Sequence, residues 1–256
     1  IKESLAAQTP IKNLAVQTPL MLKNGEGLYI NIHEASLINY PAMFLNIDPK
    51  TYSLSSHLTP DALGNKGYIQ TGSHSPWRTI VVSDDARAIL SSKLILNLNN
   101  PCAIEDTSWI KPTKYIGVWW EYFTGQGSTW AYSNTQDIVL GATDFSKLKP
   151  NGTHGANTKH VKEYIDFAAE HKFDAVLVEG WNEGWEDNTA FKKERIYSFT
   201  KAYPDFDVKE LSKYASQKGI KIIIHHETTS STAEYERKLE NALNFMNDNN
   251  YSAVKT

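Results

Sequence analysis

The densest group of ionisable side chains follows an apolar run near the C-terminal end of the sequence. Residues 222–224 are all isoleucine, which predicts a buried strand, and His225, His226 and Glu227 come directly after them. A carboxylate with two imidazoles can supply a general base and groups that bind or orient a substrate. A zinc site is one alternative, because His225 and Glu227 lie two positions apart and share one side of a strand. A solvated strand end without a function is the other. The sequence offers no third ligand with convincing spacing, so we assign no metal ligand.

A second group of polar side chains occupies residues 178–187, which are rich in carboxylates, tryptophan and glycine. Carboxylates bind hydroxyl groups and aromatic rings stack on sugar faces, so this composition is typical of saccharide binding. An acidic surface loop over a packed tryptophan would have the same composition. Glu179 is better placed for function than Glu183 or Glu186, because it lies at the predicted edge of a strand.

Two further predicted strand ends carry aromatic or charged residues. Residues 115–122 are expected to form one strand, in which Trp119 and Trp120 point to opposite sides, one toward the site and one toward helices. The following loop, residues 125–130, is expected to form part of the site wall. Lys255 follows two apolar residues on the last predicted strand. An inward lysine there requires a partner or a substrate contact, and an exposed strand end is the alternative.

The elements that would position these residues alternate regularly after Pro112. We predict strands at residues 115–122, 174–180, 220–227 and 251–255, with helices at 158–172, 207–218 and 233–247. Such alternation implies a parallel sheet with right-handed crossovers. An open doubly wound sheet and a barrel both fit. The absence of a glycine-rich phosphate loop and the polar ends of the strands favour a (β/α)8 TIM barrel, of which four strands would be present.

The sequence before Pro112 has a different character. Short alternating segments separated by turn residues predict strands at residues 28–33, 42–47, 79–82 and 94–98. The predicted fold is therefore multidomain, β plus α/β. Residues 1–112 would form the C-terminal part of a β-sandwich domain and a linker, and residues 113–256 the first half, strands 1–4, of a catalytic barrel.

Composition and length exclude some classes of partner. The 256 residues carry a net charge of -3, so no basic face for a nucleic acid is expected. No apolar run is long enough to span a bilayer.

The chain begins at Ile1 without a signal-peptide pattern and stops at Thr256 after a predicted strand. We interpret it as a segment of a longer protein, in which case the missing signal peptide says nothing about secretion.

Three segments taken together resemble glycoside hydrolase family 97. They are residues 111–121, 178–182 and 224–228, and the resemblance extends to residues 30–37 in the β-rich part. It implies an N-terminal β-sandwich, a catalytic (β/α)8 barrel and a small C-terminal β-domain. In such a protein, this chain would hold the end of the first domain and strands one to four of the second.

The resemblance also implies roles for individual residues. The family has a retaining branch with an Asp nucleophile on the fourth barrel strand and an inverting branch with a Glu base after the third. Glu227 resembles the inverting base, and Trp119, Glu179, His225 and Lys255 match positions that line the sugar pocket. The implied activity is an α-glucosidase acting on malto-oligosaccharides in starch utilisation. A retaining α-galactosidase and a noncatalytic carbohydrate-binding homologue are the alternatives.

The remaining implications concern what lies outside the chain. The resemblance implies a calcium cofactor whose ligands lie outside this segment, a general acid beyond Thr256, and a periplasmic location. Because the chain would lack the missing half of the barrel, it is expected to be inactive alone.

Overall fold

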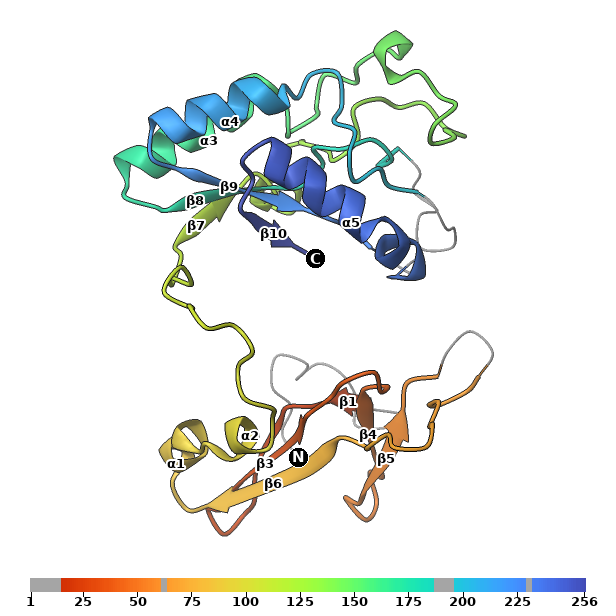
Figure 1. Ribbon diagram of the computed structural model, residues 1–256, viewed down its shortest axis with the longest axis vertical. Helices are drawn as coiled ribbons and strands as arrows, with labels where there is room; N and C mark the ends of the chain where they lie inside the picture. The colour runs from red at the N-terminus through yellow and green to blue at the C-terminus, as the bar shows by residue number, and fades with distance from the viewer. Residues whose placement is uncertain (1–14, 61–63, 187–195, 229–231) are drawn as a thin grey trace. The chain divides into compact units, whose positions relative to one another are not determined.

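The computed structural model describes residues 15–60, 64–186, 196–228 and 232–256 (Figure 1). The chain divides into two units, Ile1–Thr107 and Ser108–Thr256, and each is considered by itself. No helix within these described ranges has the length and hydrophobicity of a transmembrane span.

The described part of the first unit holds two antiparallel sheets of three strands each. The order β1-β4-β5 is formed by β1 (Ala15–Gln17), β4 (Met43–Ile47) and β5 (Leu54–Leu58). The order β2-β3-β6 is formed by β2 (Leu20–Lys23), β3 (Tyr29–Ala35) and β6 (Trp77–Ser83). The β-rich character predicted for this part of the sequence is therefore present.

A buried carboxylate links these two sheets. Glu34, on β3, is 7% exposed and accepts hydrogen bonds from Thr18 Oγ1 at 3.0 Å and from the backbone N–H of Met43, on β4, at 3.1 Å. Its other oxygen lies 3.0 Å from Arg78 Nη1. Buried carboxylates require such partners, so contacts within the unit explain why Glu34 is buried.

The strand predicted at residues 94–98 is wrong, since these residues form a short helix, α2 (Leu94–Asn97), which follows another short helix, α1 (Ala86–Ser91). The Asp85 side chain caps the first by accepting from Arg87 N. Asn99 Nδ2 donates to Ile95 O at 2.6 Å and closes the last turn of the second. The alternating leucines suggested a half-buried strand, yet Leu96 is 71% exposed. Local side-chain hydrogen bonds therefore decided the backbone conformation here.

The second unit contains a parallel sheet in the order β10-β9-β8-β7. Its strands are β7 (Tyr115–Gly117), β8 (Ala175–Val178), β9 (Lys221–His225) and β10 (Ala253–Lys255). Helices α3 (Thr158–Glu170), α4 (Val208–Gln217) and α5 (Thr232–Asp248) connect them. The predicted alternation of strands and helices is observed, and the α3 and α4 helices lie side by side against the sheet (Figure 1).

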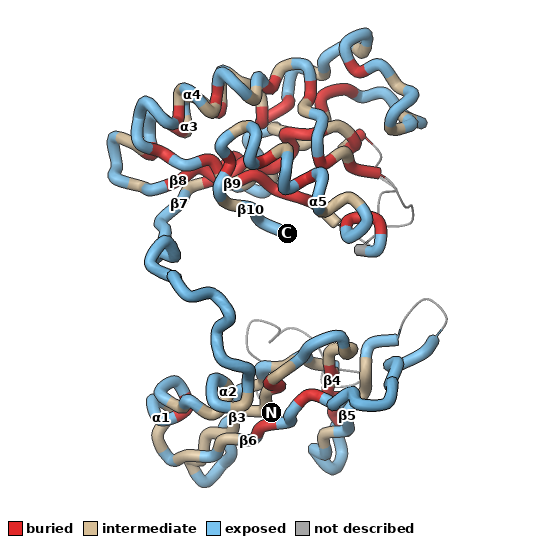
Figure 2. The backbone as a smooth tube through the Cα atoms, viewed as in Figure 1, coloured by how far each residue is buried: buried red, intermediate tan, exposed pale blue. Residues whose placement is uncertain are grey.

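The core of this unit lies between the sheet and its helices. All four residues of β8 are buried, as the red segments of Figure 2 show. From α3, Val161, Ile165 and Ala168 pack against them, a spacing that places three side chains on one helical face. Asp207 caps α4, as predicted, by accepting from Glu210 N. Gly219, with φ +70°, follows the end of that helix.

The first strand of the unit is shorter than predicted. The β7 strand ends at Gly117, and Trp120–Tyr122 form a 3₁₀ helix, η1. The turn begins at Trp119, which has helical φ and ψ of −77° and −22°. Hydrogen bonds from Tyr122 N to Trp119 O and from Phe123 N to Trp120 O, at 3.3 and 3.1 Å, hold the turn closed.

Candidate functional site

The carboxyl ends of the four parallel strands bring the sequence-predicted residues to one edge of the sheet. Trp119 follows β7, Glu179 follows β8, His225 ends β9 and Lys255 ends β10. Glu227 lies two residues beyond the end of β9. Neighbouring parallel strands end at the same side of a sheet, and this side is where α/β folds place their ligands.

Glu179 and Lys255 form the closest contact in this group. Lys255 Nζ lies 2.5 Å from Glu179 Oε1, and the glutamate is 6% exposed. The same ammonium lies 5.5 Å from the centroid of the Trp119 ring. The side chain of Lys255 is 45% exposed, so this lysine is not inward and buried, yet it pairs with Glu179. The pair joins the ends of β8 and β10 across β9.

His225 occupies the centre of the group. It is 5% exposed, and its Nε2 lies 3.8 Å from Glu227 Oε2. Burial lowers the pKa of the His225 imidazole below its ordinary value and outweighs the opposing effects of Glu179 and Glu227. Its Nδ1 is buried without a hydrogen-bond partner among the residues that the structure describes. The nitrogen of His225 that lies near another candidate residue is therefore Nε2, next to Glu227.

His226 does not join this group, which corrects the prediction that both imidazoles bind or orient a substrate. Consecutive strand residues point to opposite faces, and His226 is fully buried on the helical side. Its Nδ1 lies 3.0 Å from the Tyr235 hydroxyl, and the ring of Phe199 lies edge-on at 5.4 Å. Its position in the core makes it a structural residue.

The buried His226 predicts a loss of stability in acid. Burial and the neighbouring His225 lower the pKa of His226 from 6.5 to about 4. The unfolded chain therefore takes up a proton here below pH 6.5, whereas the folded chain does so only near pH 4. The free energy of unfolding should fall between these values by on the order of 3 kcal/mol. In the full-length protein, His226→Gln should remove that part of the pH dependence.

Urea unfolding at pH 7 and pH 4.5, followed by tryptophan fluorescence, measures this difference. Within this chain, all tryptophans except Trp77 lie in the unit that holds His226, so the unfolding of this unit contributes to the signal. His171→Gln, at an exposed position, is the matched control. An unchanged pH dependence in His226→Gln would contradict the assignment.

The arrangement of Trp119 and Trp120 also differs from the prediction. Because the strand ends at Gly117, the two rings do not point to opposite sides but stack on each other, with centroids 4.4 Å apart. The Nε1 of Trp119 is buried and has no hydrogen-bond partner within the described part of the chain. A methyl group added at Gly117 would lie 2.2 Å from this nitrogen, so the glycine creates the space that the indole occupies.

The predicted wall loop does contribute to the site, through Trp130. Its Nε1 donates to Glu179 Oε2 at 3.0 Å, and its ring packs against Tyr122 at a centroid distance of 4.2 Å. Trp130 is the last residue of the loop predicted at residues 125–130, but its contact with Glu179 was not predicted. The glycines of the loop suggested an open segment, and no local pattern indicates a contact between positions 49 residues apart.

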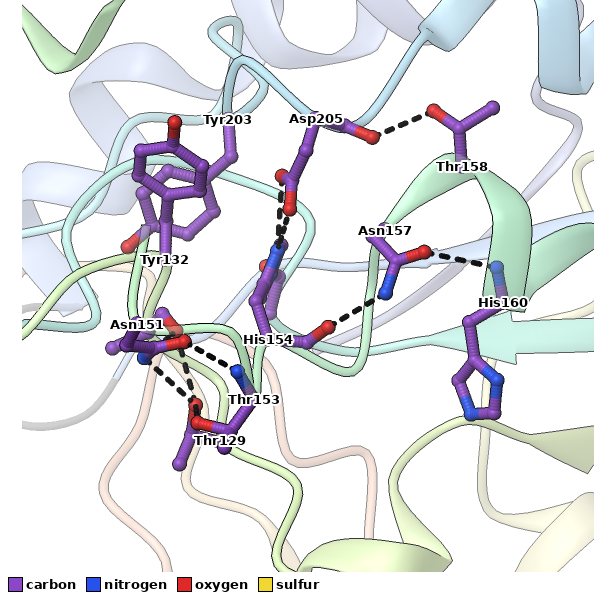
Figure 3. Close-up of polar contacts among 12 residues, drawn as sticks. Thr129, Tyr132, Asn151, Thr153, His154, Asn157, Thr158, His160, Tyr203 and Asp205 are labelled. Carbon is purple, nitrogen blue, oxygen red and sulfur yellow. Dashed lines mark hydrogen bonds and ion pairs between the residues drawn. The ribbon is translucent and has the colours of Figure 1, made fainter. Parts of the chain in front are cut away.

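A polar network holds the loop in place (Figure 3). His154 Nε2 donates to Gly180 O at 2.8 Å, and its Nδ1 lies 2.9 Å from Asp205 Oδ2. Asn151 Nδ2 donates to Thr129 Oγ1 at 3.1 Å. The His154 bond connects the segment before α3 with Gly180, the residue that follows Glu179, and the Asn151 bond connects the same segment with the loop. None of these contacts was predicted from the sequence.

Glu183 and Glu186, which follow Glu179 after β8, have different environments from that of Glu179. Glu186 is 4% exposed and accepts from the Tyr203 hydroxyl at 2.6 Å and from Ser133 N at 3.1 Å. Desolvation raises the pKa of Glu183, which faces Lys201. Glu186 therefore anchors the loop, while Glu179 is the carboxylate that lies with His225 and Lys255.

Comparison with known proteins gives consistent matches over both units. The model described as Glycoside hydrolase 97 matches residues 119–256, and the one described as Glycosyl-hydrolase 97 N-terminal matches residues 2–101. A retaining alpha-galactosidase of Bacteroides thetaiotaomicron is 27% identical over 241 residues, which cover 87% of this chain and 31% of that protein.

Solved structures extend these matches. A glycoside hydrolase family 97 enzyme from Pseudoalteromonas sp. strain K8, in complex with acarbose, is 39% identical, with a TM-score of 0.73 over 94% of this chain and 33% of that chain. A variant of that enzyme in complex with panose matches equally. A β-arabinopyranosidase, 15% identical with a TM-score of 0.54, is similar in fold alone. The chain thus spans about a third of the length of these relatives, and it belongs to glycoside hydrolase family 97.

Proposed function

We propose that the full-length protein hydrolyses α-glucosidic bonds of malto-oligosaccharides with inversion at the anomeric carbon. The observation that carries this proposal is the position of Glu227, a carboxylate 3.8 Å from the buried His225. Both lie where the ends of four strands also place Glu179, Lys255 and Trp119. Family membership supplies the hydrolase chemistry, and the 39% identical relatives that bind acarbose and panose favour glucose-containing substrates.

Each of these residues has a role in the proposed mechanism. Glu227 accepts a proton from a water molecule whose oxygen attacks the anomeric carbon, while a general acid beyond Thr256 protonates the leaving oxygen. In inverting enzymes, the two carboxyl groups stand roughly 6.5–9.5 Å apart to admit that water. His225 and the Glu179–Lys255 pair bind sugar hydroxyls, and Trp119 supplies an apolar ring face.

The proposal includes a barrel that the rest of the protein completes. Residues 113–256 are its first half, and residues 1–112 are the C-terminal part of a β-sandwich domain with a linker. Four parallel strands in consecutive order support the barrel. An apolar groove of about 490 Å³ along β7 and α3, lined by Trp120, Tyr164 and Phe167 among others, suits packing of a further element.

Calcium is proposed as the cofactor of the full-length protein, where it would supply fixed positive charge near the leaving group. The residues described in this structure do not offer a site for it, because no group of three metal-binding side chains occurs among them. Glu34, the carboxylate of the N-terminal motif, is paired with Arg78. The proposal keeps the calcium ligands outside this segment, as the family resemblance implies, and no step above depends on the ion. A periplasmic location belongs to the same proposal.

A retaining α-galactosidase is the second candidate function, and the 27% identical Bacteroides thetaiotaomicron relative favours it. The two functions differ in substrate and in the anomer released. A noncatalytic carbohydrate-binding homologue would bind a saccharide without releasing any product.

Proton NMR of maltose hydrolysis by the full-length protein, resolved by anomer, distinguishes these functions. We expect β-glucose to appear first and the reaction to stop when a calcium chelator is added. Initial release of α-glucose would overturn the inverting mechanism. Release of galactose from an α-galactoside in place of maltose cleavage would establish the second candidate, and saccharide binding without product the third. Full activity with the chelator would contradict the calcium proposal alone.

A further inference from the structure

The two carboxylate oxygens of Glu179 have different donors. Lys255 Nζ lies 2.5 Å from Oε1, and Trp130 Nε1 donates to Oε2 at 3.0 Å. Each carboxylate oxygen has two lone pairs, so the group can accept about four hydrogen bonds. Counting only donors from the residues that the structure describes, one lone pair on each oxygen remains for a ligand.

The indole of Trp130 is itself held on several sides. Its ring lies between Tyr122, at a centroid distance of 4.2 Å, and Trp185, which stacks on it at 5.9 Å with an interplanar angle of 12°. Its backbone lies against Gly180, where an added methyl group would come within 2.9 Å of Trp130 O. A ring confined in this way directs its N–H at a fixed point.

The backbone beside the carboxylate is fixed by the same cluster. The Tyr122 hydroxyl donates to the carbonyl oxygen of Glu179 at 3.2 Å. Burial raises the pKa of Tyr122, which keeps the hydroxyl protonated and able to donate. With His154 bonded to the carbonyl oxygen of Gly180, both the main chain and the side chain of Glu179 are restrained.

We propose that Trp130 is a positioning residue of the sugar site, which sets the rotation of the Glu179 carboxylate. With the rotation fixed, the remaining lone pair on each oxygen faces one direction and suits two neighbouring hydroxyls of a single sugar ring. The Lys255 contact alone would leave the group able to turn about its bond to Oε1. This inference rests on the proposed function, since it assigns the recognition of a vicinal diol to the same site.

The test compares Trp130→Phe with the unmodified full-length protein on maltose. Phenylalanine keeps a ring between Tyr122 and Trp185 but removes the N–H. We expect kcat/KM to fall about tenfold, the typical effect of losing one hydrogen bond to a charged group. The loss should come mainly from KM, because hydroxyl binding by Glu179 is made in the ground state as well as the transition state. If Trp130→Phe does not fold, Trp130→Leu, which likewise has no side-chain donor, serves the same purpose.

A double-mutant cycle separates positioning from general packing. If Trp130 acts through Glu179, then Trp130→Phe should cause little further loss in a Glu179→Gln background. Trp77→Phe is the matched control, because this tryptophan is 57% exposed and lies in the other unit. Its effect should add fully to that of Glu179→Gln.

The outcomes are distinct. A Trp130→Phe enzyme within twofold of the unmodified protein, or a loss that adds fully to Glu179→Gln, overturns the inference while leaving the proposed function intact. Failure of the unmodified protein to cleave any α-glycoside contradicts the proposed function and the inference together.

Discussion

Replacing Glu227 with glutamine in the full-length protein is expected to lower kcat on maltose by about a hundred- to ten-thousand-fold, the range for loss of a general base. Glutamine keeps the shape of the side chain but cannot accept a proton from water. Substrate binding should change little, because Glu227 acts on the attacking water. Steady-state kinetics on maltose measure both parameters. Turnover near that of the unmodified protein would exclude Glu227 as the base.

Glu183→Gln is the control for this substitution. Glu183 lies after the neighbouring strand, but the charged groups that affect its pKa are Lys201, Glu186 and Asp144, and not His225 or Lys255. The two substitutions make the same chemical change in the same unit. A similar loss in both variants would indicate a general effect of removing a carboxylate.

The parts of the site that the sequence predicted share one property, a strand that changes abruptly from apolar to polar residues. The run ending at His225 has this pattern, and so do those ending at Glu179 and Lys255. Because parallel strands of one sheet end at a common edge, the strand alternation alone was enough to bring these three side chains together. The Lys255–Glu179 contact of 2.5 Å follows from that topology.

Other features of the site and of the fold depend on contacts that no local sequence pattern reveals. Trp130 reaches Glu179 across 49 positions of sequence. His226 shares the polar character of its neighbours, yet the alternation of the strand turns it into the core, where Phe199 and Tyr235 surround it. At residues 94–98, the spacing of leucines was compatible with a strand, and hydrogen bonds from neighbouring polar side chains favoured a helix.

Trp119 combines both situations. Its position at a strand end was predictable, but its orientation depends on the end of β7 at Gly117 and on the turn that follows. The indole then lies over the glycine, stacked on Trp120 and 5.5 Å from Lys255 Nζ. The orientation of the ring that we propose to bind sugar is therefore set by a residue that carries no side chain.

Gly117→Ala is accordingly expected to reduce kcat/KM on maltose by about a hundredfold, the scale of effect of an ångström-level misplacement in a site. The new methyl group would lie 2.2 Å from both Cδ1 and Nε1 of Trp119, so the indole must leave its position. The φ of Gly117 is not in the left-handed region, and alanine adopts such a backbone without strain. The free energy of unfolding should therefore change by only about 1 kcal/mol.

Two comparisons attribute the loss to the tryptophan. Gly25→Ala, at a position with no atom within 4 Å of the new methyl group, is the matched substitution and should leave kcat/KM unchanged. In a Trp119→Ala background, Gly117→Ala should cause no further loss, because the ring that it displaces is already absent. Full additivity of the two substitutions would show that the new methyl group acts on the site by another route, through the Leu177 carbonyl oxygen, which it would approach to 3.2 Å. A purely additive result would thus mean that Gly117→Ala acts on the pairing of β7 with β8 and not on the stacked rings of Trp119 and Trp120. The cycle separates these two explanations because only the second requires Trp119.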